Sequence, residues 1–299
     1  DMRTENEEKL AAIEGGGTKF IVGVGKSYKD CVTSTISTRS AHETMAEVKR
    51  FIHEATTDGK LIGIGVGTFG PVVVNPKNAD HGLVLSTPKP QWEGYNFVTD
   101  LGSEFGVPVS VQTDVSAAAM SEAAERPQCK NLVYVTVGTG IGGGVFADGR
   151  LVSGTLHPEI GHILLTLHSS DGAFSGVCPF HGNCLEGLAS GPAIKARWGA
   201  SLSELPQDHQ AHEIEAYYLG ALCANLVLHY APEVIVLGGG VMSTPGLLVK
   251  VRRQCRSILG GYIGALDTDA AMEQLIAAPL LTKYSGIQGA FMLAEKARR

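Results

Sequence analysis

The residues best suited to chemistry lie in one short stretch, HPEIGHILLTLHSSDGAFSGVCPFHGNC, which runs from residue 157 to residue 184. Cys178, His181 and Cys184 offer three soft donor groups within seven residues, and His162 can supply a fourth from an adjoining strand. Two thiolates and two imidazoles form a common donor set of closed, structural Zn²⁺ sites. The spacing therefore predicts a structural zinc site with these four ligands.

Two other histidines and a metal-free loop are the alternatives. His168 competes for the fourth position, although it lies in a polar loop, and His157 is less suitable because Pro158 and Glu159 follow it. A surface loop with two free thiols is the metal-free interpretation. If Zn²⁺ binds, it fixes the shape of a Gly-rich loop, and the residues from 159 to 162 are positioned by the metal. The other four cysteines are scattered singly and are expected to be reduced core residues.

Glycine is clustered at four places, residues 15–17, 63–70, 138–144 and 238–240, where the backbone is expected to come close to another group. The segment GTGIGG, residues 138–143, satisfies the dinucleotide pattern G-x-G-x-x-G. That pattern should open a helix, but a second strand and an Asp148-Gly149 turn follow here. We therefore expect a β-hairpin whose turn offers backbone N–H groups to an anion. A glycine turn without a ligand is the alternative.

The segment EGGGTK, residues 14–19, has the same design of strand, glycine turn with a hydroxyl, and strand. Two such hairpins could hold a polyphosphate between them for phosphoryl transfer, in which catalysis is mostly positioning and charge stabilisation. The third segment, LGGGVM at residues 237–242, is expected to end a buried strand and enter a helix, where it could accommodate a nucleoside. Gly25-Lys26-Ser27 matches the end of a Walker A loop. The motif is excluded, however, because Phe20 occupies the position of its first glycine.

Apolar periodicity indicates the elements that must position these groups. In the first half we expect strands over residues 11–16, 19–25, 31–38, 61–67 and 107–114, and helices over 42–56, 97–106 and 115–125, the last with Asp114 as N-cap. The second half repeats the order, with strands within 131–152, helices over 185–198 and 212–229, a strand over 233–239 and a helix over 245–259. This repetition predicts a duplicated α/β architecture. We divide it into residues 2–114 and 115–284, with a helix over 285–299 that packs back on the first half.

Composition excludes several classes of function. The 299 residues are 44% hydrophobic and 18% charged, as in a globular protein of one large or two medium domains. A formal net charge of -6 argues against nucleic acid as a partner. No run of eighteen apolar residues occurs, which argues against a membrane partner and favours a cytoplasmic protein.

The motifs together resemble the ROK family (repressor, open reading frame, kinase) of the actin and hexokinase superfamily. The family signature is matched in order by residues 137–145, Gly154, Pro158, Gly161 and His162. The EGGGTK start, Thr113-Asp114 with the three alanines at 117–119, and LGGG at 237–240 fall where that family has them. The resemblance covers essentially the whole chain. It implies a two-domain actin/hexokinase-like fold, a duplicated ribonuclease H-like fold, with an interdomain cleft.

Within that family, TFGPV, TPKPQW and CPFHGNCLEGLASGPAIKARWG look like the bacterial fructokinase branch. Thr113 and Ser116 stand where glucokinases have Asn, and the zinc loop differs from theirs. A mannokinase, a glucokinase and a relaxed hexokinase are the enzyme alternatives. A sugar-responsive regulator is disfavoured, because the glycine hairpin begins near residue 14 and leaves no room for a helix-turn-helix domain. A filament protein would leave the zinc segment unexplained.

The resemblance also implies roles for single residues. Asp114 is the expected general base that takes the proton of the sugar hydroxyl, although it could merely cap its helix. Glu159, His162 and Thr113 are the expected sugar contacts, with a structural salt bridge as the alternative for Glu159. The expected cofactors are ATP, Mg²⁺ and Zn²⁺, the expected partners are a hexose and ATP, and a homodimer is an open alternative to a monomer. The residues expected to bind the nucleotide are Gly16, Gly17, Thr18, Lys19, Thr139, Gly140, Pro192, Gly238, Gly239, Gly240, Val241 and Met242.

Overall fold

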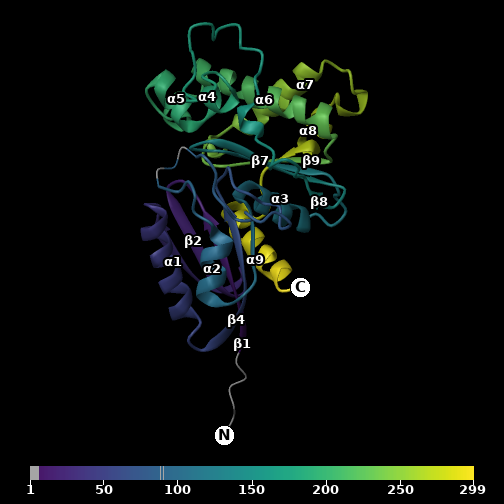
Figure 1. Cartoon of the computed structure of the whole chain (residues 1–299). Coiled ribbons are helices and arrows are strands. Elements are labelled where there is room, and N and C mark those ends of the chain that lie inside the picture. Colours follow the sequence, from purple (N-terminus) through teal and green to yellow (C-terminus); the bar gives the residue numbers. More distant parts are fainter. Residues whose placement is uncertain (1–6, 88, 90) are drawn as a thin grey trace. The chain divides into compact units, whose positions relative to one another are not determined.

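The computed structural model describes residues 7–87, 89 and 91–299 of the chain, which form two compact units (Figure 1). Unit 1 contains the described residues up to Ala124, together with Val152–His157 and Lys283–Arg299, and unit 2 contains Glu125–Leu151 and Pro158–Thr282.

The strands are β1 (Glu7–Gly15), β2 (Lys19–Ser27), β3 (Asp30–Ser37), β4 (Gly59–Thr68), β5 (Val109–Thr113), β6 (Leu132–Val137), β7 (Ile141–Ala147), β8 (Arg150–Leu151), β9 (Val234–Gly238) and β10 (Ile276–Ala277). The α-helices are α1 (Ala41–Ala55), α2 (Phe97–Phe105), α3 (Asp114–Ala124), α4 (Leu185–Ala189), α5 (Gly191–Trp198), α6 (Gln210–Tyr230), α7 (Leu247–Leu259), α8 (Asp269–Leu275) and α9 (Ser285–Ala297). Short 3₁₀ helices are η1 (Ile160–His162), η2 (Leu202–Glu204), η3 (Val241–Ser243), η4 (Gly264–Leu266) and η5 (Thr282–Tyr284).

Both units are built on a five-stranded sheet with the same topology. In unit 1 the order is β3-β2-β1-β4-β5, with antiparallel pairs on the β2 side of β1 and parallel pairs on the β4 side. In unit 2 the order is β8-β7-β6-β9-β10, again with two antiparallel and then two parallel pairings. The sequence of pairings is identical, so the predicted duplication is confirmed.

Strand β1 shows how the sheet of unit 1 is buried on both faces. Ala11 and Ile13 point into a core formed with α1 and α2, whereas Leu10 and Ala12 pack against Ile287 and its neighbours on α9. Successive side chains of a strand point to opposite faces, so this alternation requires a cover on each side. The last helix of the chain, yellow in Figure 1, provides the second cover.

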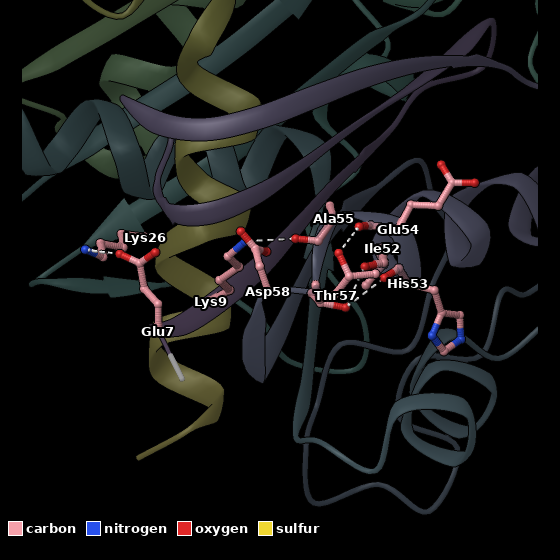
Figure 2. A network of polar contacts seen from close by, with 10 residues as sticks. Glu7, Lys9, Lys26, Ile52, His53, Glu54, Ala55, Thr57 and Asp58 are labelled. Carbon is pink, nitrogen blue, oxygen red and sulfur yellow. Dashed lines mark hydrogen bonds and ion pairs between the residues drawn. The ribbon is translucent and has the colours of Figure 1, made fainter. Parts of the chain in front are cut away.

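Polar contacts tie the start of β1 to the end of α1, as Figure 2 shows. Lys9 Nζ donates to the carbonyl oxygen of Ala55 at 3.0 Å and pairs with Asp58 at 2.6 Å. Near the same strand end, Glu7 pairs with Lys26 of β2. The Lys9 cation lies near the carboxyl end of a helix, where positive charge is favoured.

Three expected elements differ from those observed. The helix predicted over residues 185–198 is two helices, because Ser190 is extended (φ -69°, ψ 161°) and its side chain caps α5 by accepting the Ala193 N–H. After β9 the chain enters the 3₁₀ helix η3 rather than a longer helix, and α7 starts only at Leu247. His162 ends the 3₁₀ helix η1 instead of lying on a strand. Among the described residues, none of the helices is long and apolar enough to cross a membrane.

Candidate active site and metal centre

The first group of site residues lies at one edge of the sheet in unit 1. The parallel strands β1, β4 and β5 end in register, with Gly15 opposite Thr68 and Thr68 opposite Thr113. Glu14 precedes the end of β1 and Asp114 follows the end of β5 directly. Ligands of open α/β sheets bind at the carboxyl ends of such strands. Two carboxylates therefore end on the edge of the sheet where a ligand is expected.

The local structure around Asp114 differs from the predicted helix cap. Helix α3 begins at Asp114 itself, and the side chain that caps it is Thr113, whose Oγ1 accepts the Ser116 N–H at 3.1 Å. Thr113 Oγ1 also donates to Ser116 Oγ at 2.8 Å. Asp114 Oδ1 accepts the Val115 N–H at 2.9 Å. Thr113 thus caps the helix. The Asp114 carboxylate is not needed as the cap and is available for a second role.

Burial raises the pKa of Asp114 to about 6. Its hydrogen bonds with backbone N–H groups and the positive charge of Lys89 oppose this rise. A carboxyl with a pKa near the working pH is well matched to accept a proton in a transition state. The environment of Asp114 therefore suits a general base.

Glu14 is a second perturbed carboxyl at the same edge. Burial and the nearby Asp114 raise its pKa to about 7, against the opposing charge of Lys19. Its Oε2 has no hydrogen-bond partner among the described residues. Helix α9 comes so close that a Cβ at Gly286 would overlap the Glu14 carboxylate, so a larger residue there would have to displace that carboxylate. Sequence reasoning gave Glu14 no role, although it stands directly before a glycine-rich turn.

The turn between β1 and β2 carries the predicted phosphate contacts of unit 1. Gly16 N–H donates to the Lys19 carbonyl at 2.9 Å, which closes the turn. Thr38 holds it from the side, since its Oγ1 donates to the Gly16 carbonyl at 2.8 Å. Gly17, Thr18 and Lys19 are exposed at the tip. Their binding to phosphate stays a prediction.

In unit 2 three glycine segments meet at the carboxyl ends of β6 and β9. Gly191 N–H, at the start of α5, donates to the Gly138 carbonyl at 2.8 Å. Gly239 has a φ of 93°, which favours glycine, and a Cβ there would overlap the backbone of Val137. The residues predicted to bind nucleotide in this unit are therefore gathered at one edge: Thr139, Gly140, Pro192, Gly238, Gly239, Gly240, Val241 and Met242.

The hairpin predicted at residues 138–143 is present, but one of its N–H groups is already occupied. Strands β6 and β7 pair from Leu132 opposite Phe146 to Val137 opposite Ile141. The Ile141 N–H donates to Glu186 Oε2 at 2.8 Å. A carboxylate of α4 therefore takes an amide that we expected to face a bound anion.

Glycines also fix the position of η1, which follows Glu159 directly and ends at His162. A Cβ at Gly143 would overlap the Ile160 side chain, and a Cβ at Gly161 would overlap the Ile141 carbonyl. The 3₁₀ helix can therefore lie directly on β7. His162 N–H donates to the Glu159 carbonyl at 3.0 Å, and the Glu159 side chain is exposed.

The four predicted metal ligands come together. One donor atom each of His162, Cys178, His181 and Cys184 lies within 4.8 Å of all the others. His162 Nδ1 is 3.8 Å from Cys178 Sγ and 3.5 Å from Cys184 Sγ, and His181 Nδ1 is 3.6 Å from Cys178 Sγ. Ligand atoms about 2.0–2.3 Å from a tetrahedral Zn²⁺ would be roughly 3.3–3.8 Å apart. The donor set and its spacing fit that ion.

Glu186 is the residue of unit 2 that sequence reasoning missed. Besides holding the Ile141 N–H, it places Oε1 4.0 Å from His162 Nε2, the ring nitrogen on the far side from the cysteines. The separation is longer than a hydrogen bond, but it puts a carboxylate on the side of the ring where such a group orients a metal-binding imidazole. Its place two residues after Cys184, in the first turn of a helix, was the available signal.

Comparison with known proteins identifies the family. The sequence model of the ROK family matches residues 10–297. The chain belongs to the ROK family. It is 39% identical to the fructokinase of Zymomonas mobilis subsp. mobilis over 97% of this chain and 98% of that protein. It is 36% identical to the fructokinase of Lactococcus lactis subsp. cremoris, over 95% of this chain and 96% of that protein.

Solved structures agree with this assignment. A ROK hexokinase from Thermus thermophilus matches with a TM-score of 0.75 and 25% identity, over 96% of this chain and 98% of that one. A ROK glucokinase from Streptomyces griseus, solved with glucose and AMPPNP, has the same fold at a TM-score of 0.75 and 24% identity, over 96% and 99% of the two chains. The predicted actin/hexokinase-like fold is confirmed, and the chain is an ATP-dependent sugar kinase of the family.

Proposed function

We propose that the enzyme transfers the γ-phosphoryl group of MgATP to the primary hydroxyl of D-fructose, giving D-fructose 6-phosphate and ADP. The observation that carries the choice of sugar is the similarity to fructokinases over nearly the whole chain, at 34–39% identity for the curated fructokinases compared. The N-acetylmannosamine kinase of Vibrio cholerae is 27% identical, over 83% of this chain. Fructose is therefore the first substrate to test.

Asp114 is the proposed general base. Its carboxylate takes the proton of the sugar hydroxyl while that oxygen attacks the γ-phosphorus and the bond to the bridging oxygen of ADP breaks. The support is a carboxylate at the carboxyl end of β5, a pKa raised to about 6, and a helix cap supplied by Thr113 instead. Such assistance typically contributes about 10²- to 10⁴-fold to a rate.

The exposed turn at Gly17 and Thr18 and the glycine edge of unit 2 are the proposed phosphate and nucleotide contacts. Glycine lets the backbone approach a ligand closely, and backbone N–H groups in such turns bind anions. Glu159 and the His162 ring are the proposed hydroxyl contacts of the sugar. Thr113, the third residue predicted to contact the sugar, is buried and its hydroxyl is bonded to Ser116. These assignments follow from the family resemblance and from the exposure of Glu159 directly before η1.

A structural Zn²⁺ is proposed at the Cys178, His181, Cys184 and His162 cluster. The ion would use all four protein ligands and leave no open position, so it fastens the loop and supplies no nucleophile. Cys178 and Cys184 are both buried, and His162 ends the short helix that Glu159 directly precedes. The metal would in this way fix the segment that presents the proposed sugar contact.

A coupled assay for ADP formation, with MgATP and a panel of fructose, mannose, glucose and N-acetylmannosamine, tests the proposal. We expect the highest kcat/KM with fructose. A value for fructose far below that for another sugar of the panel would refute the assignment of the substrate, while turnover of none of them would refute hexose phosphorylation itself.

A further inference from the structure

Lys89 places a cation on the glycine turn of unit 1. An added Cβ at Gly17 would overlap Nζ and Cε of Lys89, so the end of this side chain lies directly over the turn. Gly17 is exposed apart from this contact and belongs to the turn predicted to bind phosphate. The side chain comes from the long connection between β4 and α2, to which we had given no function.

The connection is anchored on both sides of Lys89. Before it, Thr87 Oγ1 accepts the Lys89 N–H at 3.3 Å and donates to the Gly70 carbonyl at 3.4 Å. After it, Gln91 is held at a φ of 65°, a strained conformation that persists only where the surroundings fix it. The Gln91 carbonyl accepts the Ala41 N–H at 3.4 Å. The position of the lysine is therefore built into the fold.

Trp92 is the main anchor. It is 1% exposed, its Nε1 donates to the Arg39 carbonyl at 2.8 Å, and its ring stacks on Phe20 with centroids 5.2 Å apart. Phe20 is the third residue after Gly17, and Trp92 is the third after Lys89. The two segments therefore contact each other at two points with the same spacing. Trp92 packs on Phe20, and Lys89 lies over Gly17. Burial of a large aromatic side chain stabilises this match strongly.

Lys89 also acts on Asp114. Its positive charge lowers the pKa of that carboxyl, against the effect of burial. A simpler interpretation is that Lys89 only keeps Asp114 ionised. Three facts argue for more: the ammonium lies over the turn, the connection is anchored at Trp92, and Asp114 already has the Val115 N–H to stabilise its charge.

We propose that the Lys89 ammonium binds the phosphoryl group in transfer, above Gly17 and beside Asp114, and so acts as a second catalytic residue of unit 1. The inference rests on the proposed phosphoryl transfer. As the sugar oxygen bonds to the γ-phosphorus and the bridging bond to ADP breaks, the hydroxyl proton goes to Asp114, and Lys89 keeps its own proton throughout. A fixed cation at developing negative charge is a common and large source of transition-state stabilisation.

Lys89→Met removes the charge and keeps much of the side-chain length. Lys77→Met is the matched control, because Lys77 is exposed in the same connection. We expect kcat/KM of Lys89→Met to fall about 10²- to 10³-fold, the usual effect of removing one transition-state donor. Lys89→Arg should recover part of the loss, and Lys77→Met should behave like the wild type. Equal melting temperatures of the proteins show that each variant is folded.

Calorimetric titration with Mg²⁺-AMPPNP and Mg²⁺-ADP tests the contact without turnover. The wild type should bind AMPPNP more tightly than ADP, and Lys89→Met should lose most of that difference while its affinity for ADP stays the same. This measurement remains informative even if no hexose of the panel is phosphorylated. The test of the Lys89 contact therefore does not depend on the proposed sugar substrate.

The pH dependence separates phosphoryl binding from a pure charge effect on Asp114. If Lys89 only kept Asp114 ionised, the rate of Lys89→Met would return to the wild-type value at pH 9, where Asp114 is ionised in both proteins. We expect the deficit to persist at pH 9. Full recovery there, or an unchanged preference for AMPPNP over ADP, would overturn the proposal.

Discussion

Glu186 Oε2 accepts the Ile141 N–H at 2.8 Å, while the other oxygen of the same carboxylate lies 4.0 Å from His162 Nε2. One side chain thus joins the glycine hairpin of unit 2 to the proposed metal centre. The loop fastened by the metal and the turn that we expect to meet phosphate are therefore not independent parts. A substitution at either part should therefore change ligand binding at the other.

Glu186→Ala should weaken both sites together. It leaves the Ile141 N–H without its acceptor, and loss of a partner for such a group costs about 1–3 kcal/mol. We expect KM for ATP and KM for the sugar each to rise roughly tenfold, in line with that range. Glu186→Gln keeps an acceptor oxygen and should restore the ATP value. If alanine changes neither KM in steady-state assays, the coupling does not exist.

Asp114→Asn should lower kcat about 10²- to 10⁴-fold, since the amide cannot accept the proton of the hydroxyl. Nucleotide affinity, measured by calorimetry, should stay within a factor of about two, because binding does not need the base. Asp80→Asn is the control, as Asp80 is an exposed carboxylate of the connection between β4 and α2. Near-normal turnover of the Asp114 variant would exclude it as the base.

The activity of the wild type should depend on pH through the same group. The pKa of Asp114 is raised from 3.8 to about 6, so the ionised form that can accept a proton prevails only above about pH 6. We expect kcat/KM to fall about tenfold for each pH unit below that value. The profile is measured with sugar well below its KM. A flat profile between pH 5 and 7 would contradict the assignment.

Glu14 should make stability depend on pH in the opposite direction to an ordinary salt-bridged carboxyl. Its pKa rises from 4.5 to about 7 on folding, so between these values the folded protein holds more protons than the unfolded chain. Stability contributed by this group is therefore present at low pH and falls as pH rises through the window from about 4.5 to 7.

Glu14→Gln removes that dependence. At pH 8 the variant should be more stable than the wild type, by at most about 3 kcal/mol for such a pKa rise. Urea unfolding at pH 5 and pH 8 measures the difference. A variant less stable than the wild type at pH 8 would show that the charged form of Glu14 is favoured in the fold.

Removal of the metal should affect stability and sugar binding together. Metal analysis of the wild type should give about one zinc per chain. Cys184→Ser should lose most of this metal, lower the melting temperature and raise KM for the sugar. Zinc binding to such a site is coupled to folding of its loop. Cys129→Ser lies outside the cluster and should keep both the metal and the activity. Wild-type protein purified without chelators but free of zinc would refute the site.

Much of the fold and of the metal cluster could be predicted from sequence, because the signals are local. Alternating apolar residues mark strands such as β1 and β2, and the close spacing of Cys178, His181 and Cys184 limits where their side chains can go. The order of these elements repeats, and the pairing of the two sheets confirms the repetition.

What sequence could not provide were contacts between distant segments. Lys89 meets Gly17 only because Trp92 is buried against Phe20, and Glu186 meets Ile141 only because α4 packs near β7. The N-cap was assigned to Asp114 because aspartate is common there, but the hydroxyl of Thr113 forms the bond. N-cap propensity ranks residue types. The geometry at the end of β5 decides which of the two neighbouring residues forms the capping bond.

The packing of α9 on β1 has a consequence for how the protein is made. The sheet face of Leu10 and Ala12 is covered by residues of α9 such as Ile287 and Phe291, which are synthesised long after β1. At about 5–20 residues per second, translation of the intervening chain takes on the order of 15–60 s. During this time the apolar face of the first sheet has no helix to cover it. The nascent chain should therefore bind chaperones, and ribosome stalling or truncation before α9 is complete should yield aggregates.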